Sequence, residues 1–423
     1  MLSKSSLTIS SPTPNPEKED VMNWFTSKTN NLQKLYVIKA LRSGMFSIAI
    51  IILFFKQHGL SMREITLLQS LFAIAVLLFE VPTGNYADNY GKKKSILIGG
   101  CFSVSGYVAY SLSSTFLGFL TGEILLAIGF CFVSGADSAL IYDNTEQDQE
   151  GNQSFIKTEG NGGSASMFSE AITSFIGGSF LALVSLRFPI YFDVLLALTV
   201  FPVALSLHEP EKTEEEKQQQ KEERESSITK MLRIMKYSLH GHVEIKWLII
   251  YSAVVSTSTL TMVWFIQIYW MAAHVPIFMF GGLWATLMCV GALVSMRAHV
   301  IEKKLKRKRS LIALIVLPVI AYVLLGLHVA WWSVSFIALF YVVRGMNNPI
   351  MKSYINGLVS KKERATILSV QSLIGRWMFA IIGPCIGWVH DVYSLQIAFA
   401  VCAVLFATMG FIVLMFLHKN RLL

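Results

Sequence analysis

The sequence predicts an all-α polytopic membrane protein with twelve transmembrane helices in two six-helix bundles. The first observation is composition: 53% of the 423 residues are hydrophobic, only 15% are charged, and the mean hydropathy is +0.53. The second is that apolar runs long enough to cross about 30 Å of hydrocarbon recur along the whole chain. The third is a single long charged stretch at 208–243, with six such runs before it and six after it.

The predicted helices end where charge, glycine or proline interrupts the apolar runs. In the first half the interruptions read "HGLS", "ADNYGKKK", "LSSTF", "DNTEQDQEGNQ" and "RFP", and the helices lie at 33–57, 62–84, 95–113, 115–141, 162–185 and 188–207. In the second half the interruptions read "HVP", "EKKLKRKRS", "LHVAW", "SKKER" and "DVYS", and the helices lie at 246–272, 276–298, 310–327, 329–355, 366–389 and 393–417.

The distribution of positive charge predicts the orientation. With the N-terminus inside, most of the 36 lysines and arginines fall in inner loops and tails. The outer loops then hold Lys56, Arg63 and Arg187. Because basic residues favour the cytoplasmic side, we expect both termini in the cytoplasm of a multi-pass inner-membrane protein. This charge pattern also explains the formal charge of +9 without nucleic acid as a partner.

The pattern divides the chain into five segments. A polar N-terminal segment, "MLSKSSLTISSPTPNPEKED", lacks the apolar core of a signal peptide and is expected to be a disordered tail. Within the linker, Ile228, Met231, Leu232, Met235 and Leu239 share one helical face, which predicts an amphipathic helix on the inner leaflet; the alternative is the start of the seventh helix. The predicted segments are a tail at 1–31, a bundle at 32–207, the linker at 208–244, a bundle at 245–418 and a tail at 419–423.

The loop between the second and third predicted helices carries a motif: a glycine, three residues, an aspartate, two residues, a glycine and a basic run. Here it runs from Gly84 through Asp88 and Gly91 to Lys92. This motif resembles the loop 2–3 signature of the major facilitator superfamily. The segments "EVPTG", "SGADSALIYD", "RATILS" and "GPCIGWVHD" add a resemblance to its bacterial drug-resistance-like branch. The resemblance covers roughly residues 33–418 and implies an alternating-access transporter, usually proton-coupled.

The same motif predicts a gate at the inner face. Because the family places helix 2 against helix 11, Asp88 is expected to face the positive N-terminus of helix 11, where Arg364 can add an ion pair. Gly84 and Gly91 are expected to allow close approach and a sharp turn, and Lys92 to hold the loop inside beside anionic lipid. Three further acids near inner helix ends complete the predicted gate: Glu80, Asp137 and Asp143.

Charges inside the membrane are costly and mark candidate functional sites. Arg42 lies near mid-depth in the first helix, with Lys39 three residues before it on nearly the same face. A buried guanidinium needs an acidic partner or an anionic substrate, so Arg42 binds either solute or an acid such as Glu123. The other predicted substrate-binding residues are Arg344, Asn347, Asn348, Trp264 and Gln267.

Two intramembrane acids are candidate proton carriers. Glu123 lies on the fourth helix, which the resemblance makes a cavity-lining helix, and Glu170 lies on the fifth. Burial disfavours the charged form of a carboxyl group, and a reversible proton carrier requires this. A fixed ion pair is the alternative for Glu123. Many family members carry an arginine in that stretch of helix 4, so this sequence departs from the pattern there.

Together these features predict a monomeric, non-enzymatic secondary transporter that uses protons and needs no cofactor. The sequence lacks the glycine-rich lysine motif of ATP-binding loops, and its cysteines and histidines have no metal-ligand spacing. The intramembrane cations favour an anionic or zwitterionic solute, such as a carboxylate metabolite or siderophore. The alternatives are proton-antiport efflux of lipophilic cations, which suits the aromatic content and buried acids, and a non-transporting sensor or scaffold on the same fold.

Overall fold

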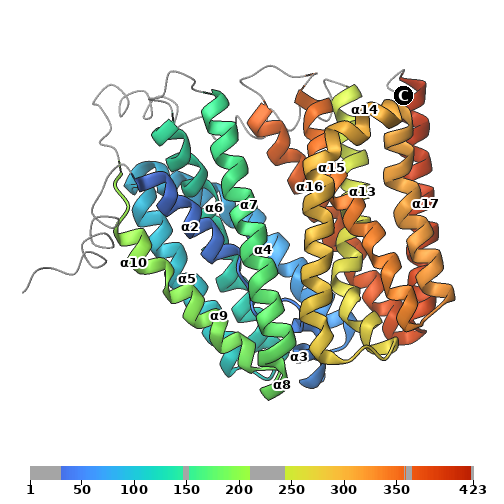
Figure 1. Cartoon of the computed structure of the whole chain (residues 1–423), viewed down its shortest axis with the longest axis horizontal. Helices are drawn as coiled ribbons and strands as arrows, with labels where there is room; N and C mark the ends of the chain where they lie inside the picture. Colours follow the sequence, from blue (N-terminus) through green and yellow to red (C-terminus); the bar gives the residue numbers. More distant parts are fainter. Residues whose placement is uncertain (1–29, 146–151, 210–242, 357, 359–363, 421–423) are drawn as a thin grey trace, which may run out of the picture.

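The computed structural model describes residues 30–145, 152–209, 243–356, 358 and 364–420, and within these it is helical without strands (Figure 1). In that described part, nine helices are long and apolar enough to cross a membrane. The predicted helical membrane fold is therefore confirmed, and the number of twelve spans stays a prediction. The amphipathic helix expected at 228–239 lies outside the described residues.

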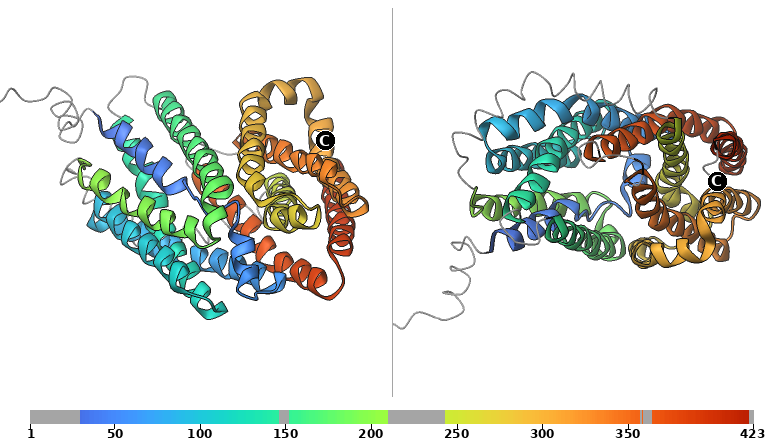
Figure 2. Two further views of the ribbon diagram at one scale, coloured as in Figure 1. Left: turned by 60° about the horizontal axis from the view of Figure 1, so that its bottom comes forward. Right: turned by 90° about the horizontal axis from the view of Figure 1, so that it is seen from above.

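The helices form two groups that stand side by side in Figure 1, and Figure 2 shows the same groups in contact from two further directions. The first group comprises α2 (Asn31–Ser43), α3 (Ile51–Gln57), α4 (Met62–Tyr90), α5 (Lys92–Leu112), α6 (Phe116–Thr145), α7 (Asn152–Ile176), the π-helical turn η2 (Gly177–Leu181), α8 (Ala182–Val184), α9 (Phe188–Leu198) and α10 (Val200–Leu205). The second comprises α13 (Val243–Ala272), η4 (Ile277–Met279), α14 (Phe280–Leu327), η5 (Trp331–Ile337), α15 (Ala338–Asn356), α16 (Arg364–Val392) and α17 (Leu395–Lys419).

The first predicted helix is not continuous. The structure divides 33–57 into α2 and α3, with a non-helical segment at 44–50 between them. Such a break leaves backbone groups without helical partners, and in a membrane these groups need partners from the protein. Polar side chains from other helices supply them: Asp193 accepts from Phe46, and Gln267 bonds to Ile48 and Ile52. The local sequence does not reveal these distant partners, which is why the continuous helix was wrong.

The eighth and ninth predicted helices are joined. The structure extends helix through most of the basic stretch that we expected to be a loop, and interrupts it at Lys306, which has a φ of 63° and a ψ of 159°. Lysine, glutamate and leucine are good helix formers, so this stretch continues the helix. The tenth predicted helix begins instead as the 3-10 segment η5 and continues as α15.

The two halves meet along two pairs of helices, α4 with α16 and α7 with α14. They also touch at the lower end in Figure 1, where α3 packs on α13 and η2 on η4. Gly281 of α14 lies directly against the backbone of α7. A Cβ on Gly281 would lie 2.6 Å from the carbonyl oxygens of Ser174 and Phe175, closer than real Cβ atoms come.

Gly281→Ala is therefore expected to destabilise the protein by about 1–3 kcal/mol, because neither backbone can move without repacking a helix. The measurement is the thermal unfolding temperature in detergent. Gly282→Ala is the matched control, since its added Cβ would meet only the Phe175 ring, at 3.8 Å. Equal unfolding temperatures for the two variants would contradict the expected clash.

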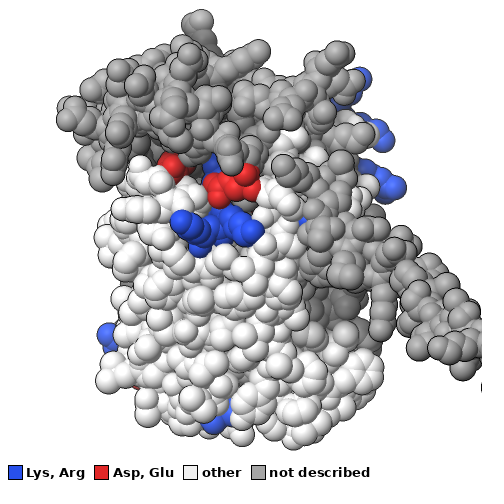
Figure 3. Space-filling model, turned by 90° about the vertical axis from the view of Figure 1, so that its left-hand side faces the viewer, with Lys and Arg blue, Asp and Glu red and all other residues white. Residues whose placement is uncertain are grey.

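The outer surface fits a surrounding hydrocarbon layer. Figure 3 shows a broad uncharged band below a cluster of basic and acidic side chains on the side where α5 and α10 lie. At the start of α5, the Glu209 carboxylate accepts the backbone N–H groups of Lys92 (2.6 Å) and Lys93 (3.2 Å). The Lys93 ammonium donates to the carbonyl oxygens of Leu205 and Leu207. The basic run therefore ties the start of α5 to the end of α10 within the first half.

Candidate functional site

A cavity of about 390 Å³ lies within the first half and is closed on one side by Trp264 of the second. Three carboxyl groups line it, from three different helices: Glu123 of α6, Glu170 of α7 and Asp193 of α9. One cationic side chain, Arg42, also lines it. We call this space the acidic cavity. Its remaining wall is largely aromatic and aliphatic, with Phe72, Tyr107, Tyr110, Phe130, Leu41, Ile48 and Leu126 among the lining residues.

Glu123 is buried, with 4% of its surface exposed, and its partners are neutral. It accepts hydrogen bonds from the Gln69 side-chain amide of α4 and from the Tyr110 hydroxyl of α5. Within the described residues no lysine, arginine or histidine lies at ion-pair distance from it. The alternative of a fixed Arg42–Glu123 ion pair is therefore not what the structure contains.

Arg42 pairs instead with Asp137 of α6, with 3.4 Å between the guanidinium and the carboxylate. Its guanidinium also lies 5.0 Å from the centre of the Phe130 ring. Asp137, predicted as a gate residue, thus contacts an arginine of the cavity wall. Lys39 is buried and packs against Gly162 of α7 instead of lining the cavity.

Asp193 holds the break between α2 and α3. Its two carboxylate oxygens accept the backbone N–H groups of Phe46 (2.6 Å) and Ser47 (3.2 Å), and the side chain is 1% exposed. The Thr173 hydroxyl accepts the preceding N–H, from Met45, at 2.9 Å. The non-helical segment is therefore bonded, group by group, to α9 and α7.

Gln267 secures the other end of the same segment. Its amide donates to the carbonyl oxygen of Ile48 and accepts the N–H of Ile52, both at 2.9 Å. The residue is buried in α13, so this pair of bonds joins the two halves. We predicted that Gln267 binds substrate, but here both ends of its side-chain amide bond to backbone groups. Glu170 also connects the halves, since the Trp284 indole N–H of α14 lies 3.3 Å from its carboxylate.

Two adjoining cavities of about 280 and 300 Å³ have the opposite character. They share Arg376 and Gln371 of α16 and Asn348 of α15, and one is also lined by Arg344 of α15 and the other by Lys352. Glu80 of α4 is the one carboxyl group among their lining residues. We call them the basic cavities. Within the described residues, neither arginine has a carboxylate at ion-pair distance.

One polar group beside the basic cavities lacks a described partner. Asn347 donates to the Ser256 hydroxyl at 3.0 Å, but its amide oxygen is buried without a hydrogen-bond partner among the described residues. Phe130 lines both the acidic cavity and one basic cavity. The Arg376 guanidinium lies 5.4 Å from the centre of its ring, close to the Arg42 distance. The Phe130 ring therefore marks the boundary between the two charge environments.

The predicted inner gate is described in part. Asp88 is exposed at the end of α4, and the side chains of Arg364 and Asp143 lie outside the described residues. Gly91 has a φ of 108°, so the predicted sharp turn is present there. At Gly84 an added Cβ would meet no described atom within 4 Å, so the expected close approach is absent in this conformation.

The structure also brings in residues that the sequence did not select. Gln69, Tyr107 and Tyr110 surround Glu123, and Arg376 lines both basic cavities. In the sequence, Asp193 and Arg376 could have been found only by the general criterion that a charged residue lies within a transmembrane helix. For Gln69 and the tyrosines no local signal exists, because only helix packing brings them to Glu123.

Comparison with known proteins places these features in a family. Residues 35–381 match the sequence pattern of the Major Facilitator Superfamily. An uncharacterized MFS-type transporter of Methanocaldococcus jannaschii is 29% identical over 177 residues, 42% of each chain. The aligned part thus spans less than half the length of this curated relative.

Solved structures share the fold at low sequence identity. The nucleoside transporter NupG superposes with a TM-score of 0.71 at 14% identity, covering 92% of this chain and 99% of that chain. A POT family transporter in complex with 5-aminolevulinic acid gives 0.67 at 14% identity, covering 92% and 96%. The human organic anion transporter MFSD10 gives 0.59 at 14% identity, covering 91% and 99%. By the family match and the shared fold, this chain belongs to the major facilitator superfamily.

Proposed function

We propose that this protein is a proton-coupled secondary transporter that moves a small zwitterionic organic solute by alternating access. The observation that carries the proposal is the division of charge across Phe130. Carboxyl groups line the cavity of the first half, and arginines without described carboxylate partners line the basic cavities, one of which lies between the halves and the other within the second half. A solute with a cationic and an anionic end can satisfy both sets, and desolvated charges need such partners.

The same division selects among the sequence hypotheses. A purely anionic solute, such as a carboxylate metabolite or siderophore, would bind the arginines. It would bring no cationic partner to the carboxyl groups of the acidic cavity, which are Glu123, Glu170 and Asp193. A lipophilic cation suits the acidic cavity and its aromatic wall, which keeps proton-antiport efflux as the second candidate. No described feature favours a non-transporting sensor. The similar structures are described as a nucleoside transporter, a transporter in complex with 5-aminolevulinic acid and an organic anion transporter, so the fold does not choose the solute.

Glu123 is the proposed proton carrier, with Glu170 as the rival. Glu123 is supported by its burial, its place in the cavity and its neutral partners. The proposed setting is a monomer in the inner membrane with both termini cytoplasmic, in contact with lipid. Membership of the drug-resistance-like branch and the division at 208–244 belong to this proposal as well.

The test is uptake into proteoliposomes under an imposed pH gradient, with a matched set of solutes. Each zwitterion, an amino acid or dipeptide, is compared with its N-acetyl form, which keeps only the anion, and its amide, which keeps only the cation. We expect the zwitterion to exceed both capped forms by about tenfold or more, because each capped form leaves desolvated charges unpaired. Arg376→Gln should reduce zwitterion transport and leave transport of the amide unchanged.

Arg297→Gln is the control for that variant, since Arg297 is an exposed arginine of α14 outside the cavities. If the amide and other cations move faster than the zwitterion, the efflux candidate replaces the proposal. If no solute responds to the pH gradient while exchange occurs, proton coupling is wrong.

A further inference from the structure

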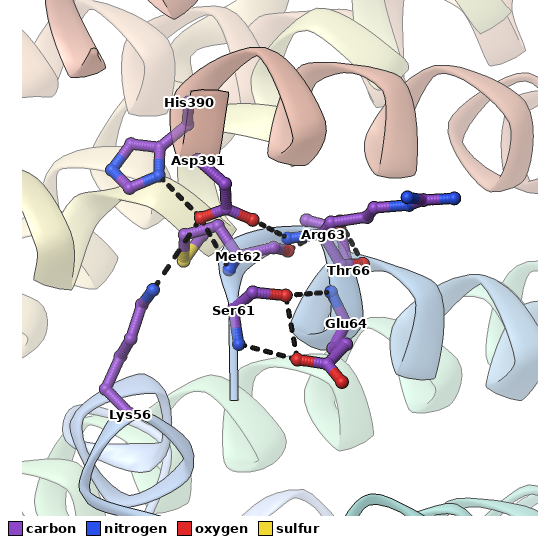
Figure 4. A network of polar contacts seen from close by, with 8 residues as sticks. All are labelled: Lys56, Ser61, Met62, Arg63, Glu64, Thr66, His390 and Asp391. Carbon is purple, nitrogen blue, oxygen red and sulfur yellow. Dashed lines mark hydrogen bonds and ion pairs between the residues drawn. The ribbon is translucent and has the colours of Figure 1, made fainter. Parts of the chain in front are cut away.

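The end of α16 is bonded to the beginning of α4, and this contact joins the two halves at the face predicted to lie outside (Figure 4). The Asp391 carboxylate accepts the backbone N–H groups of Met62 at 3.0 Å and Arg63 at 2.7 Å. The first residues of a helix have N–H groups without helical partners, and the helix dipole adds positive potential there. Asp391 thus caps a helix of the other half.

The cap from Asp391 adds to a capping box that α4 forms with its own residues. Ser61 and Glu64 form a capping box: the Ser61 hydroxyl accepts the N–H of Glu64 at 3.2 Å, and the Glu64 carboxylate accepts the N–H of Ser61 at 2.8 Å. This box leaves the N–H groups of Met62 and Arg63 without partners from their own half. Asp391 takes those two, so the start of α4 is fully capped only while the halves are together.

Two more features hold Asp391 in place. One helical turn earlier, Gly387 lets α16 lie against α4, since a Cβ there would be 2.5 Å from the Thr66 hydroxyl and 2.7 Å from the carbonyl oxygen of Met62. The Lys56 ammonium of α3 lies 3.8 Å from the carboxylate, and the His390 ring nitrogen lies 3.1 Å from it. Asp391 lines none of the cavities described above.

We propose that Asp391 is the outer gate residue, a carboxylate that keeps the outer end closed by capping α4 and is withdrawn when that end opens. Its position mirrors the gate predicted for Asp88. The α4–α16 pair is antiparallel, with Asp88 at the end of α4 and Asp391 at the end of α16. The alternating access proposed above requires the outer ends of α4 and α16 to part, and the cap by Asp391 breaks when they do. This role rests on the proposed alternating access but does not depend on which solute is moved.

Spin-label distances across the outer end test the gate. Labels are placed at Leu112→Cys, at the end of α5, and Ala272→Cys, at the end of α13, both of them exposed positions, after the exposed native cysteines 101, 289 and 385 are replaced by serine. We expect Asp391→Asn to raise the population with a long distance by about tenfold or more, because the charged cap is lost and one acceptor becomes a donor. Lys56→Gln should give a smaller increase, because its ion pair is long and partly exposed.

Glu64→Gln is the matched control. It removes a carboxylate from the same turn, but that carboxylate bonds only within the first half. An equal increase for Glu64→Gln, or an unchanged distance distribution for folded Asp391→Asn, would overturn the proposal. If Asp391→Asn does not fold, Asp391→Glu keeps the charge on a longer side chain. An unchanged distribution for folded Asp391→Glu then overturns it, and a partial increase supports it.

Discussion

Glu123→Gln is expected to abolish pH-driven accumulation of solute while counterflow exchange continues. The glutamine keeps the shape of the side chain and can still bond to Gln69 and Tyr110, but it cannot bind and release a proton. A transporter without its proton carrier still changes conformation with solute bound, and so exchanges solute without responding to the gradient. The expected accumulation is that of protein-free liposomes, measured beside exchange in the same preparation.

The reason for assigning this role to Glu123 is its surroundings. It is buried in the acidic cavity, its partners are an amide and a phenol, and no described cation neutralises it. A buried carboxylate without a counter-charge is unstable as an anion, so protonation stabilises the empty state. A solute cation entering the cavity would favour the charged form, which couples binding to proton release.

Glu170→Gln is the comparison that decides between the two candidates. Glu170 lines the same cavity but contacts Trp284 of the opposite half, so its loss should alter how the halves meet and slow transport without removing coupling. Glu123→Asp, which restores a carboxyl group, should restore part of the accumulation. Coupling that survives in Glu123→Gln and disappears in Glu170→Gln would assign the proton to Glu170.

The sequence predicted the fold class because membrane insertion depends on local composition. Apolar runs and the basic loops are properties of contiguous residues, and both are averaged over many side chains. Where helices depart from continuity the cause is distant. The break at 44–50 depends on Asp193, some 147 positions away, and on Gln267, some 215 positions away. No property of "SGMFSIAI" alone distinguishes it from a helix.

The site was predicted in part for the same reason. Intramembrane charge is a local signal, and it pointed to Arg42, Glu123 and Glu170, all of which line the acidic cavity. Their partners are set by packing: Arg42 contacts Asp137 and not Glu123, and Gln267 bonds to backbone. Asp391 was part of a quoted motif but received no role, because its cap on α4 exists only once α16 and α4 are side by side.

Asp193→Ala should be the most destabilising substitution at the cavity. The carboxylate accepts the N–H groups of Phe46 and Ser47 at the break between α2 and α3, and alanine removes the acceptor of both. An unpaired buried donor costs about 1–3 kcal/mol, so the loss at two donors is large for any membrane protein of this size. We expect a marked fall in the unfolding temperature in detergent, together with loss of transport, because Met45 and Ile48 of this segment and Arg42, just before it in α2, line the cavity.

Asp193→Asn separates the acceptor from the charge. Its amide oxygen can still accept one N–H, while its amide nitrogen faces the other donor, so the unfolding temperature should fall by an intermediate amount. Thr199→Val is the control in the neighbouring turn, since its exposed hydroxyl donates to the Leu196 carbonyl of the same segment and touches no residue of the break. If Asp193→Ala has the same unfolding temperature as Thr199→Val and yet loses transport, the carboxylate acts through its charge and not through the backbone that it holds. Asp193→Asn would then lose transport as completely as Asp193→Ala does. Hydrogen bonds from Asp193 to the backbone would not by themselves require that result.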